Sequence, residues 1–364
     1  MDGSFVSSRV KLARFTGCLA LVVCAPDALS QGCVPARLLS PGWFLQASEL
    51  RPHEWSMTIS YRFFHAFRDV QGSRTLPVPS APDIYANTHV HGLDLTLTYA
   101  VTTRLSLTLD SPLQYGTRET YVEHGDGSAH SMRAVGMGDL RFVGNISLLD
   151  PEKHPDQNIA FSVGLKAPTA ARATGASYRA TGPISRPVDP SIQPGDGGWG
   201  LLLGANAFKR ISRTSFAYFQ GVYLLNPRQM SKTETVFGDN PELTGGDIGY
   251  ILDSVPDQFL GRAGIGQTIW RSKGISALVG ARIDGVPQQD LIGGSDGFRL
   301  PGYSLSVDPG VSIARGKNLF VFTVPVAVKR HVSYAVADKR TNSPYGGIAT
   351  LADYQITVSY SRRF

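Results

Sequence analysis

The 364-residue sequence has little of three things on which other protein classes depend: cysteine, charge and long apolar runs. It holds 3 cysteines, of which Cys18 and Cys24 lie near the N-terminus. Only 18% of its residues are charged. No stretch approaches the roughly 18 consecutive apolar residues of a membrane-spanning helix. These absences exclude a disulfide-stapled domain and a helical membrane protein.

The first 30 residues have the pattern of an export signal. A basic stretch, "SSRVKLAR", precedes a short apolar centre, "FTGCLALVVCA", and Ala28 and Ser30 have the small-residue spacing that a signal peptidase reads. We therefore expect a cleavable signal peptide over 1–30 rather than a buried helix, with Gln31 as the first mature residue. Segment 31–53 would then be a periplasmic N-terminal segment or a partial plug.

A net charge of +6 and an isoelectric point near 9.2 could indicate a nucleic-acid partner. The arginines and lysines are instead spread singly through alternating segments, without a basic helix or an aromatic-basic recognition motif. Export also removes most nucleic acids as partners. We expect no nucleic-acid partner and no cofactor.

What the sequence does have is apolar and polar alternation, with 39 glycines and 23 prolines favouring strands and turns. The chain even ends on such a segment, which closes with the aromatic Phe364. About twelve segments of this kind occur, most of them long enough to cross a bilayer as tilted strands. They are 54–64, 92–101, 104–115, 138–149, 158–167, 198–208, 214–225, 259–270, 274–284, 303–314, 318–328 and 352–364.

The connections between these segments alternate between long and short. For example, the short stretch "TT" follows the second segment and "RGK" follows the tenth. The connections after the first, third and fifth segments are much longer and span 65–91, 116–137 and 168–197. This rhythm is typical of an outer-membrane barrel with short periplasmic turns and long extracellular loops, and a soluble sandwich has no reason to show it. We predict an all-β fold over 54–364: a transmembrane up-and-down antiparallel β-barrel of about 12 strands, located in the cell outer membrane.

Lipid would leave an open sheet edge without hydrogen-bond partners, so the last strand must pair with the first. Tyr360 and Phe364 then resemble the C-terminal signal that the barrel-insertion machinery of the outer membrane reads. Arg362 departs from that pattern, but a long cationic side chain beside the interface can reach water.

Alternation also assigns charged residues to the lumen-facing side of each strand, because a charge at the lipid midplane costs roughly 2–4 kcal/mol. The predicted lumen-lining residues are Arg62, Asp94, Arg104, Asp110, Asp139, Arg141, Lys166, Arg282, Asp284 and Asp308. They could form salt bridges that stiffen the wall or take part in solute passage. Arg262 and Lys329 have the same parity, but a bulge in the glycine-rich segment 259–270 or near Pro325 would reverse it.

Two features could bind metal. His89 and His91 share one strand face near the outer rim, with His124 and His130 in the next loop, but no cysteine or glutamate cluster supports them, so we predict no metal site. "DPSIQPGDGGWG" resembles a ligand loop through its aspartates, yet a compact turn that leads into the next strand and anchors Trp199 at the interface explains it better.

No chemical motif indicates an enzyme. An outer-membrane hydrolase needs serine, histidine and a polar partner facing outward on neighbouring strands. Outward positions here are nearly all aliphatic or aromatic, and no G-x-S-x-G motif occurs. We predict a protein that is not an enzyme and has no catalytic residues.

"TISYRFFHAFRDVQG", "VGMGDLRF", "VGLKAPTA" and the closing aromatic strand, in this order, resemble the outer-membrane transporter-like family associated with meta-pathway phenol degradation. The resemblance implies a channel for passive passage of a small, aromatic or hydrophobic solute. The partners expected are outer-membrane lipid, the insertion machinery and the solute. The alternative is a non-conducting surface barrel whose extracellular loops bind a partner, as in an adhesin, or, less in keeping with the motifs, a barrel hydrolase.

Overall fold

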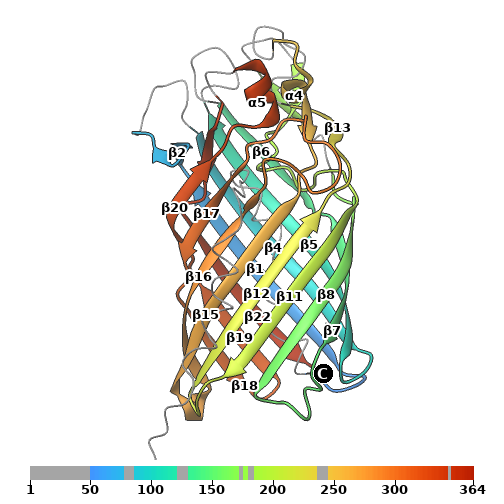
Figure 1. Ribbon diagram of the computed structural model, residues 1–364, viewed down its shortest axis with the longest axis vertical. Helices are drawn as coiled ribbons and strands as arrows, with labels where there is room; N and C mark the ends of the chain where they lie inside the picture. The colour runs from blue at the N-terminus through green and yellow to red at the C-terminus, as the bar shows by residue number, and fades with distance from the viewer. Residues whose placement is uncertain are drawn as a thin grey trace, which may run out of the picture.

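A computed structural model describes residues 50–77, 86–120, 130–171, 175–178, 184–235, 245–342 and 346–364. The expected signal peptide, most of the expected plug segment and His124 lie outside these ranges. Figure 1 shows tilted strands arranged around a barrel, with α4 (Ile248–Ile251) and α5 (Val336–Thr341) at one end and the C-terminus at the other. None of the described helices is long and apolar enough to cross a membrane.

The barrel wall is a single antiparallel sheet of fifteen strand elements. Three wall strands are each interrupted once, so the described wall has twelve strands, as predicted. Their bounds are β1 Trp55–Ala66, β4 Ala86–Ala100, β5 Leu105–Thr120, β6 His130–Met137 with β7 Leu140–Ser147, β8 Gln157–Ala167, β11 Gly200–Arg210, β12 Ser215–Leu225, β15 Gln258–Trp270, β16 Ile275–Val286, β17 Gly302–Val307 with β18 Gly310–Arg315, β19 Asn318–Thr323 with β20 Val326–Val332, and β22 Tyr354–Arg363.

Pairing of β1 with β22 closes the barrel. The register runs from Ser56 opposite Arg363 to His65 opposite Tyr354. Because every wall strand then has two neighbours over most of its length, the backbone N–H and C=O groups of the wall are satisfied within the sheet, which is the condition for a strand in hydrocarbon. The predicted closure is confirmed.

Each interruption has a local cause. Pro309 and Pro325 lack the N–H that a ladder hydrogen bond needs, and they separate β17 from β18 and β19 from β20. β6 and β7 are separated at Gly138 and Asp139, where a Cβ on Gly138 would lie 2.7 Å from the Pro112 side chain. The disturbance expected at Pro325 is therefore present, together with two others.

The two ends of the barrel differ as the sequence predicted. At the end of the barrel that holds the C-terminus, which we call the short-turn end, short turns join β4 to β5, β11 to β12, β15 to β16 and β18 to β19. The turn between β15 and β16 contains the 3-10 helix η2 (Arg271–Lys273). The opposite long-loop end carries α4, α5 and three small sheets. These are β2 Arg68–Gln71 with β3 Arg74–Thr75 and β21 Ile348–Leu351, β9 Gly175–Tyr178 with β10 Ile184–Pro187, and β13 Met230–Glu234 with β14 Leu252–Ser254.

Apolar side chains face out and most polar ones face in. On β1 the outward Trp55 is 44% exposed, whereas the inward Ser60 is 0% exposed. The same alternation runs through β4, β5 and β22. A surface of large exposed apolar side chains around the whole wall is unfavourable in water and favourable in lipid. This outer belt is the lipid-facing surface of the barrel.

Aromatic rings mark the short-turn end of that belt. Trp55, Trp270 and Phe364 are exposed there. The Phe364 N–H donates to the Trp55 carbonyl at 2.8 Å, which ties the last residue to the first strand. The Arg362 guanidinium lies 5.6 Å from the centre of the Phe364 ring. Arg362 therefore lies where a cation can reach interfacial water, and a role of this strand in insertion stays a prediction.

Candidate functional site

The inner wall is the candidate site, and its charges are paired. On β1 and β4, Arg62 Nε donates to Asp94 Oδ2 at 2.8 Å and Nη2 donates to Oδ1 at 3.1 Å. Gly92 lies opposite Arg62, and a Cβ there would lie 3.2 Å from Nη2, so the glycine leaves room for the guanidinium. Such a two-point bond holds a buried pair in one geometry.

The other inner-wall charges are paired in the same way. Arg141 donates to Asp110 at 3.1 Å, and Thr96 donates to the same carboxylate at 2.7 Å. The remaining pairs are Lys166 with Asp196 at 2.5 Å and with Asp139 at 3.8 Å, Arg262 with Asp308, and Arg282 with Asp284 at 2.8 Å. Every charge named here has an opposite charge within 4 Å, although Lys166 is shared by two carboxylates, and this pairing favours a wall-stiffening role.

Two predicted positions differ from the expectation. Arg104 lies in the turn between β4 and β5 and is exposed, because β5 begins one residue later. On β20, Val328 is an extra residue between the pairs Ala327–Ser306 and Lys329–Leu305, so Lys329 faces outward, contrary to the expectation. Arg262, whose parity was also in question, faces inward and is buried beside Asp308.

His89 and His91 lie on the outer face, where neighbouring side chains engage them. The His89 ring stacks on His65 with 4.2 Å between centres, and His91 Nδ1 lies 2.7 Å from the Tyr61 hydroxyl. Within the described ranges, no group of three or more His, Cys, Asp or Glu side chains could hold a metal ion. The arrangement is that of an aromatic band at the long-loop end of the lipid-facing belt.

The segment 188–198, which contains the motif "DPSIQPGDGG", folds into the barrel. Ile192 is 0% exposed, and Gln114 Nε2 donates to the carbonyls of Ile192 and Gln193 at 3.1 Å each. A Cβ on Gly116 would lie 2.7 Å from Ile192 Cβ, so this glycine on β5 allows the close approach. The turn was expected, but its inward position was not, and the only signal was a glycine on a strand more than seventy positions earlier.

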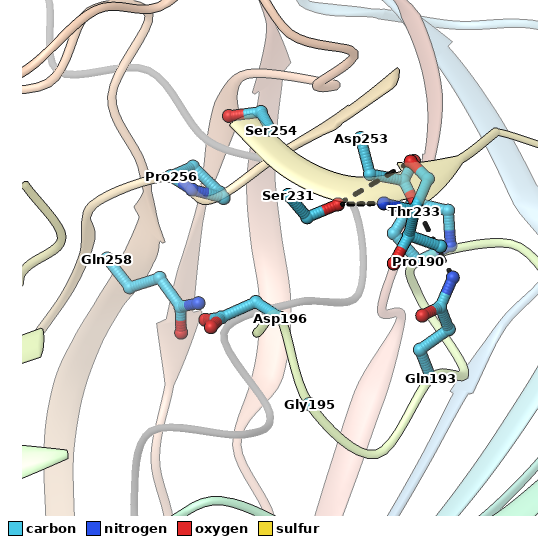
Figure 2. A pocket seen from close by; sticks show the side chains of 10 residues that line it. All are labelled: Pro190, Gln193, Gly195, Asp196, Ser231, Thr233, Asp253, Ser254, Pro256 and Gln258. Atoms are coloured by element: carbon cyan, nitrogen blue, oxygen red, sulfur yellow. Dashed lines mark hydrogen bonds between the residues drawn. The ribbon is translucent and has the colours of Figure 1, made fainter. Parts of the chain in front are cut away.

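A small polar pocket lies between this segment and the β13–β14 hairpin (Figure 2). Asp196 and Gln258 point toward each other across it, and Ser231, Thr233 and Asp253 line its other side. Gln258 is 1% exposed, and its Oε1 atom has no hydrogen-bond partner among the residues that the structure describes. The Lys166 ammonium neutralises Asp196, and Gln193 Nε2 donates to Asp253 at 3.3 Å.

An apolar cluster adjoins the pocket on the inner wall. It consists of five buried side chains from β7, β11, β12 and β15: Val143, Leu202, Val222, Leu224 and Leu260. Leu224 lies opposite Gln258 in the β12–β15 ladder, so the cluster begins at the pocket. Sequence reasoning assigned a wet lumen and missed this cluster, because β11 and β12 are apolar on both faces and show no clear alternation.

The opposite part of the inner wall is polar. Serine and threonine ladders join β1 to β22, with Oγ atoms 2.6 Å apart for Thr58 and Ser361 and 2.8 Å apart for Ser60 and Ser359. Such cross-strand hydroxyl pairs stabilise the sheet and offer hydrogen bonds to a solute. The inner wall is thus polar around β1 and β22, and across from them it carries a five-residue apolar patch among polar and charged side chains such as Arg141, Gln220 and Arg262.

Comparison with known proteins supports the fold. An outer-membrane channel from Pseudomonas putida F1 is similar, with a TM-score of 0.53 and 15% identity over 90% of this chain and 100% of that chain. Lower in similarity are the CymD monoaromatic hydrocarbon channel (TM-score 0.40, 10% identity, 93% and 99% covered) and the Pseudomonas putida toluene transporter TodX (TM-score 0.41, 8% identity, 92% and 95% covered). No family model and no curated protein matches. The first of these likenesses shows that the chain has the fold of an outer-membrane β-barrel.

Proposed function

We propose that this protein is an outer-membrane channel through which a small, uncharged solute passes passively. The observation that carries the proposal is the inner wall, whose charged side chains lie in ion pairs and whose largely polar surface carries one apolar patch. Neutralised charges neither attract nor repel a neutral solute. The apolar cluster is in keeping with the aromatic or hydrophobic solute that the family resemblance implies.

Location and assembly belong to the same proposal. Residues 1–30 would direct export, and the C-terminal strand would be read by the insertion machinery. Segment 31–53 would act as a partial plug, and Leu50, its first described residue, is buried. Deleting 31–50 should then raise permeability, and unchanged permeability would contradict the plug.

Swelling of liposomes that contain the purified chain tests the function. Uncharged solutes of increasing size should enter at rates that fall with size, and a cation and an anion of equal size should enter at equal rates. Swelling no faster than in protein-free liposomes would contradict a channel. Protein-free liposomes also correct for the direct passage of apolar solutes through lipid.

One observation favours the alternative of a barrel that binds a partner through its loops. Arg340 of α5 donates to both carboxylate oxygens of Asp247 at 2.6 and 2.8 Å and to Asp296 at 2.8 Å. This clamp joins three long loops, and Leu291 and Ile292 are 71% and 56% exposed on one of them. Loop binding without conductance in planar bilayers would favour this alternative.

A further inference from the structure

The short-turn end of the barrel has an uneven distribution of charge. Four stretches there, 209–214, 271–274, 315–317 and 361–364, hold nine lysines and arginines and no aspartate or glutamate. These cations, which we call the basic arc, are Lys209, Arg210, Arg213, Arg271, Lys273, Arg315, Lys317, Arg362 and Arg363. Without these nine, 26 of the 35 lysines and arginines would remain against 29 acidic residues. The basic arc therefore accounts for the whole net charge of +6.

The four stretches form one continuous surface, because they lie at the ends of neighbouring strands. β12 pairs with β15, β16 with β18, and β19 with β22, so the turns follow one another around the rim. The Ala314 N–H donates to the Gly274 carbonyl at 2.9 Å. The Arg363 N–H donates to the Lys317 carbonyl at 3.0 Å. The next turn along the rim, between β7 and β8, limits the basic arc, since it holds three acidic residues within 150–156.

Most cations of the basic arc are available to a partner. Eight of the nine side chains are exposed, and Arg363 is partly exposed. Arg210 pairs with Asp156 at 2.7 Å, and Arg363 donates to the Gly316 carbonyl at 3.2 Å. In the part of the chain that the structure describes, the other seven form no ion pair. Like charges on one rim repel one another, so a negatively charged partner would be attracted there.

Apolar side chains within the basic arc indicate that this partner is a membrane surface. The Lys273 ammonium lies 4.0 Å from the centre of the Trp270 ring. The Arg362 guanidinium lies 5.6 Å from the centre of the Phe364 ring. Ile211, in the β11–β12 turn, is 58% exposed. Long cationic side chains beside aromatic rings are typical of the edge of a lipid-facing belt. A soluble polyanion would gain nothing from these apolar side chains, whereas a bilayer surface accommodates both kinds.

We propose that the basic arc binds the phosphate groups of anionic phospholipids in the leaflet that surrounds the short-turn end. The ammonium and guanidinium groups contact the phosphates, and Trp270, Phe364 and Ile211 lie among the adjoining ester and acyl groups. Clusters of about four to eight basic residues beside a membrane-embedded segment commonly recognise anionic lipid. The ligand class is a phospholipid with a net negative charge, such as phosphatidylglycerol, because a zwitterionic headgroup carries its own cation beside the phosphate. The inference goes beyond the proposed channel and does not depend on the passage of a solute.

Quenching of tryptophan fluorescence in reconstituted vesicles tests the basic arc locally. Trp43, Trp55 and Trp199 are replaced by phenylalanine, so that Trp270, which is 51% exposed, reports alone from within the arc. The quenchers are phosphatidylglycerol and phosphatidylcholine with a nitroxide on the acyl chain near the headgroup, each added at the same low mole fraction to phosphatidylcholine vesicles. At low salt, the relative binding constant of phosphatidylglycerol over phosphatidylcholine should be about 2–5. In about 0.5 M salt it should fall toward one, because salt screens exposed charges.

Matched variants separate the position of the charges from their number. The arc variant removes four arc charges and should bring the relative binding constant to about one; it combines Arg271→Gln, Lys273→Gln, Arg315→Gln and Lys317→Gln. The control variant removes four exposed cations at the long-loop end and should keep the preference; it combines Arg74→Gln, Arg133→Gln, Lys232→Gln and Lys339→Gln. Lys273→Arg with Lys317→Arg keeps the charges and should also keep the preference.

Folding is checked by heat-modifiable migration in SDS gels. If the arc variant does not fold, Arg315→Gln with Lys317→Gln gives the same comparison with a smaller expected loss of preference. An unchanged preference in that variant would contradict the proposal.

The remaining outcomes also decide. Equal quenching by the two lipids in the unchanged arc would overturn the proposal, and it is the result expected if the cations only reach water or bind a soluble acidic partner. A preference that survives in the arc variant, or that the control variant also loses, would overturn it as well. None of these outcomes depends on conductance, so the proposed channel function holds or fails independently.

Discussion

At the scale of single residues, the inner-wall ion pairs are the features on which stability depends most. Asp94 is 0% exposed, and Arg62 is its partner. Arg62→Ala would leave a buried, uncompensated carboxylate, so we expect a loss of about 3–5 kcal/mol in the free energy of unfolding. Urea unfolding of the refolded chain in detergent measures it.

A matched double variant separates the pair from the single charge. Arg62→Met combined with Asp94→Leu removes both charges and fills their space, and it should cost far less than Arg62→Ala alone. If Arg62→Ala proves as stable as the unchanged chain, the pairs do not stiffen the wall.

Tyr218 illustrates the opposite case of a polar atom that does not stabilise the protein. Its hydroxyl on β12 is buried and makes no hydrogen bond of good geometry among the described residues, although the Arg262 guanidinium lies nearby, 5.3 Å from the centre of the ring. Tyr218→Phe should therefore unfold at the same or a higher temperature. Tyr61→Phe, which loses the contact with His91, should be less stable by about 0.5–1.5 kcal/mol. An equal loss in both variants would show that Tyr218 has a partner after all.

Asp69 should make the small β2–β21 sheet at the long-loop end sensitive to pH. Burial raises the pKa of Asp69 from 3.8 to about 6, although the Thr350 hydroxyl donates to it at 2.6 Å. A raised carboxyl pKa means that ionisation opposes the folded sheet. The sheet should therefore lose stability as the pH rises from about 4 to about 6, and change little above that.

Hydrogen exchange measures this dependence. Protection factors in β2 and β21 should be lower at pH 7 than at pH 4, and Asp69→Asn should make them independent of pH. Equal protection at the two pH values in the unchanged chain would show that Asp69 ionises without cost.

At the scale of elements, the Arg340 clamp decides how the long loops behave. Arg340 joins α5 to Asp247 at the start of α4 and to Asp296 in the loop after β16. Arg340→Ala should speed hydrogen exchange in α4 and α5 while the wall strands stay unchanged. Arg340→Lys should restore only part of the protection, because an ammonium cannot form the two-point bond. Unchanged exchange in α4 would show that the clamp is incidental.

Sequence could predict those elements whose own residues carry the signal. β1, β4 and β22 alternate cleanly, so the faces of these strands followed from parity, although β4 begins at Ala86, six residues before the predicted segment. β11 and β12 do not, because residues such as Leu202 and Leu224 are apolar on the inner face as well. The outward position of Lys329 depends on one extra residue, which only the pairing with β17 reveals.

The candidate site was less predictable than the fold. Arg62 and its inward neighbours could be assigned from parity, but their partners could not, since each pair joins different strands. The inward fold of 188–198 depends on contacts with β5 that are distant in sequence, such as Gln114 with Ile192. Gln258 has nothing in its local sequence to distinguish it. Its place in the pocket results from the packing of three chain segments.

At the scale of the whole molecule, the chain forms a closed wall with lipid outside and an inner surface that is largely polar, with its charges in ion pairs and one apolar patch. The belt of exposed apolar residues and the pairing of β1 with β22 explain why the chain is stable in a membrane. The paired charges explain why a neutral solute is the expected cargo.

Single-channel recording of the full chain in planar bilayers tests this account most directly. In a potassium chloride gradient, we predict discrete conductance steps with a reversal potential near zero, because nearly all of the described inner-wall charges lie beside an opposite charge. The absence of steps, or a reversal potential close to that of a strictly cation- or anion-selective pore, would contradict it.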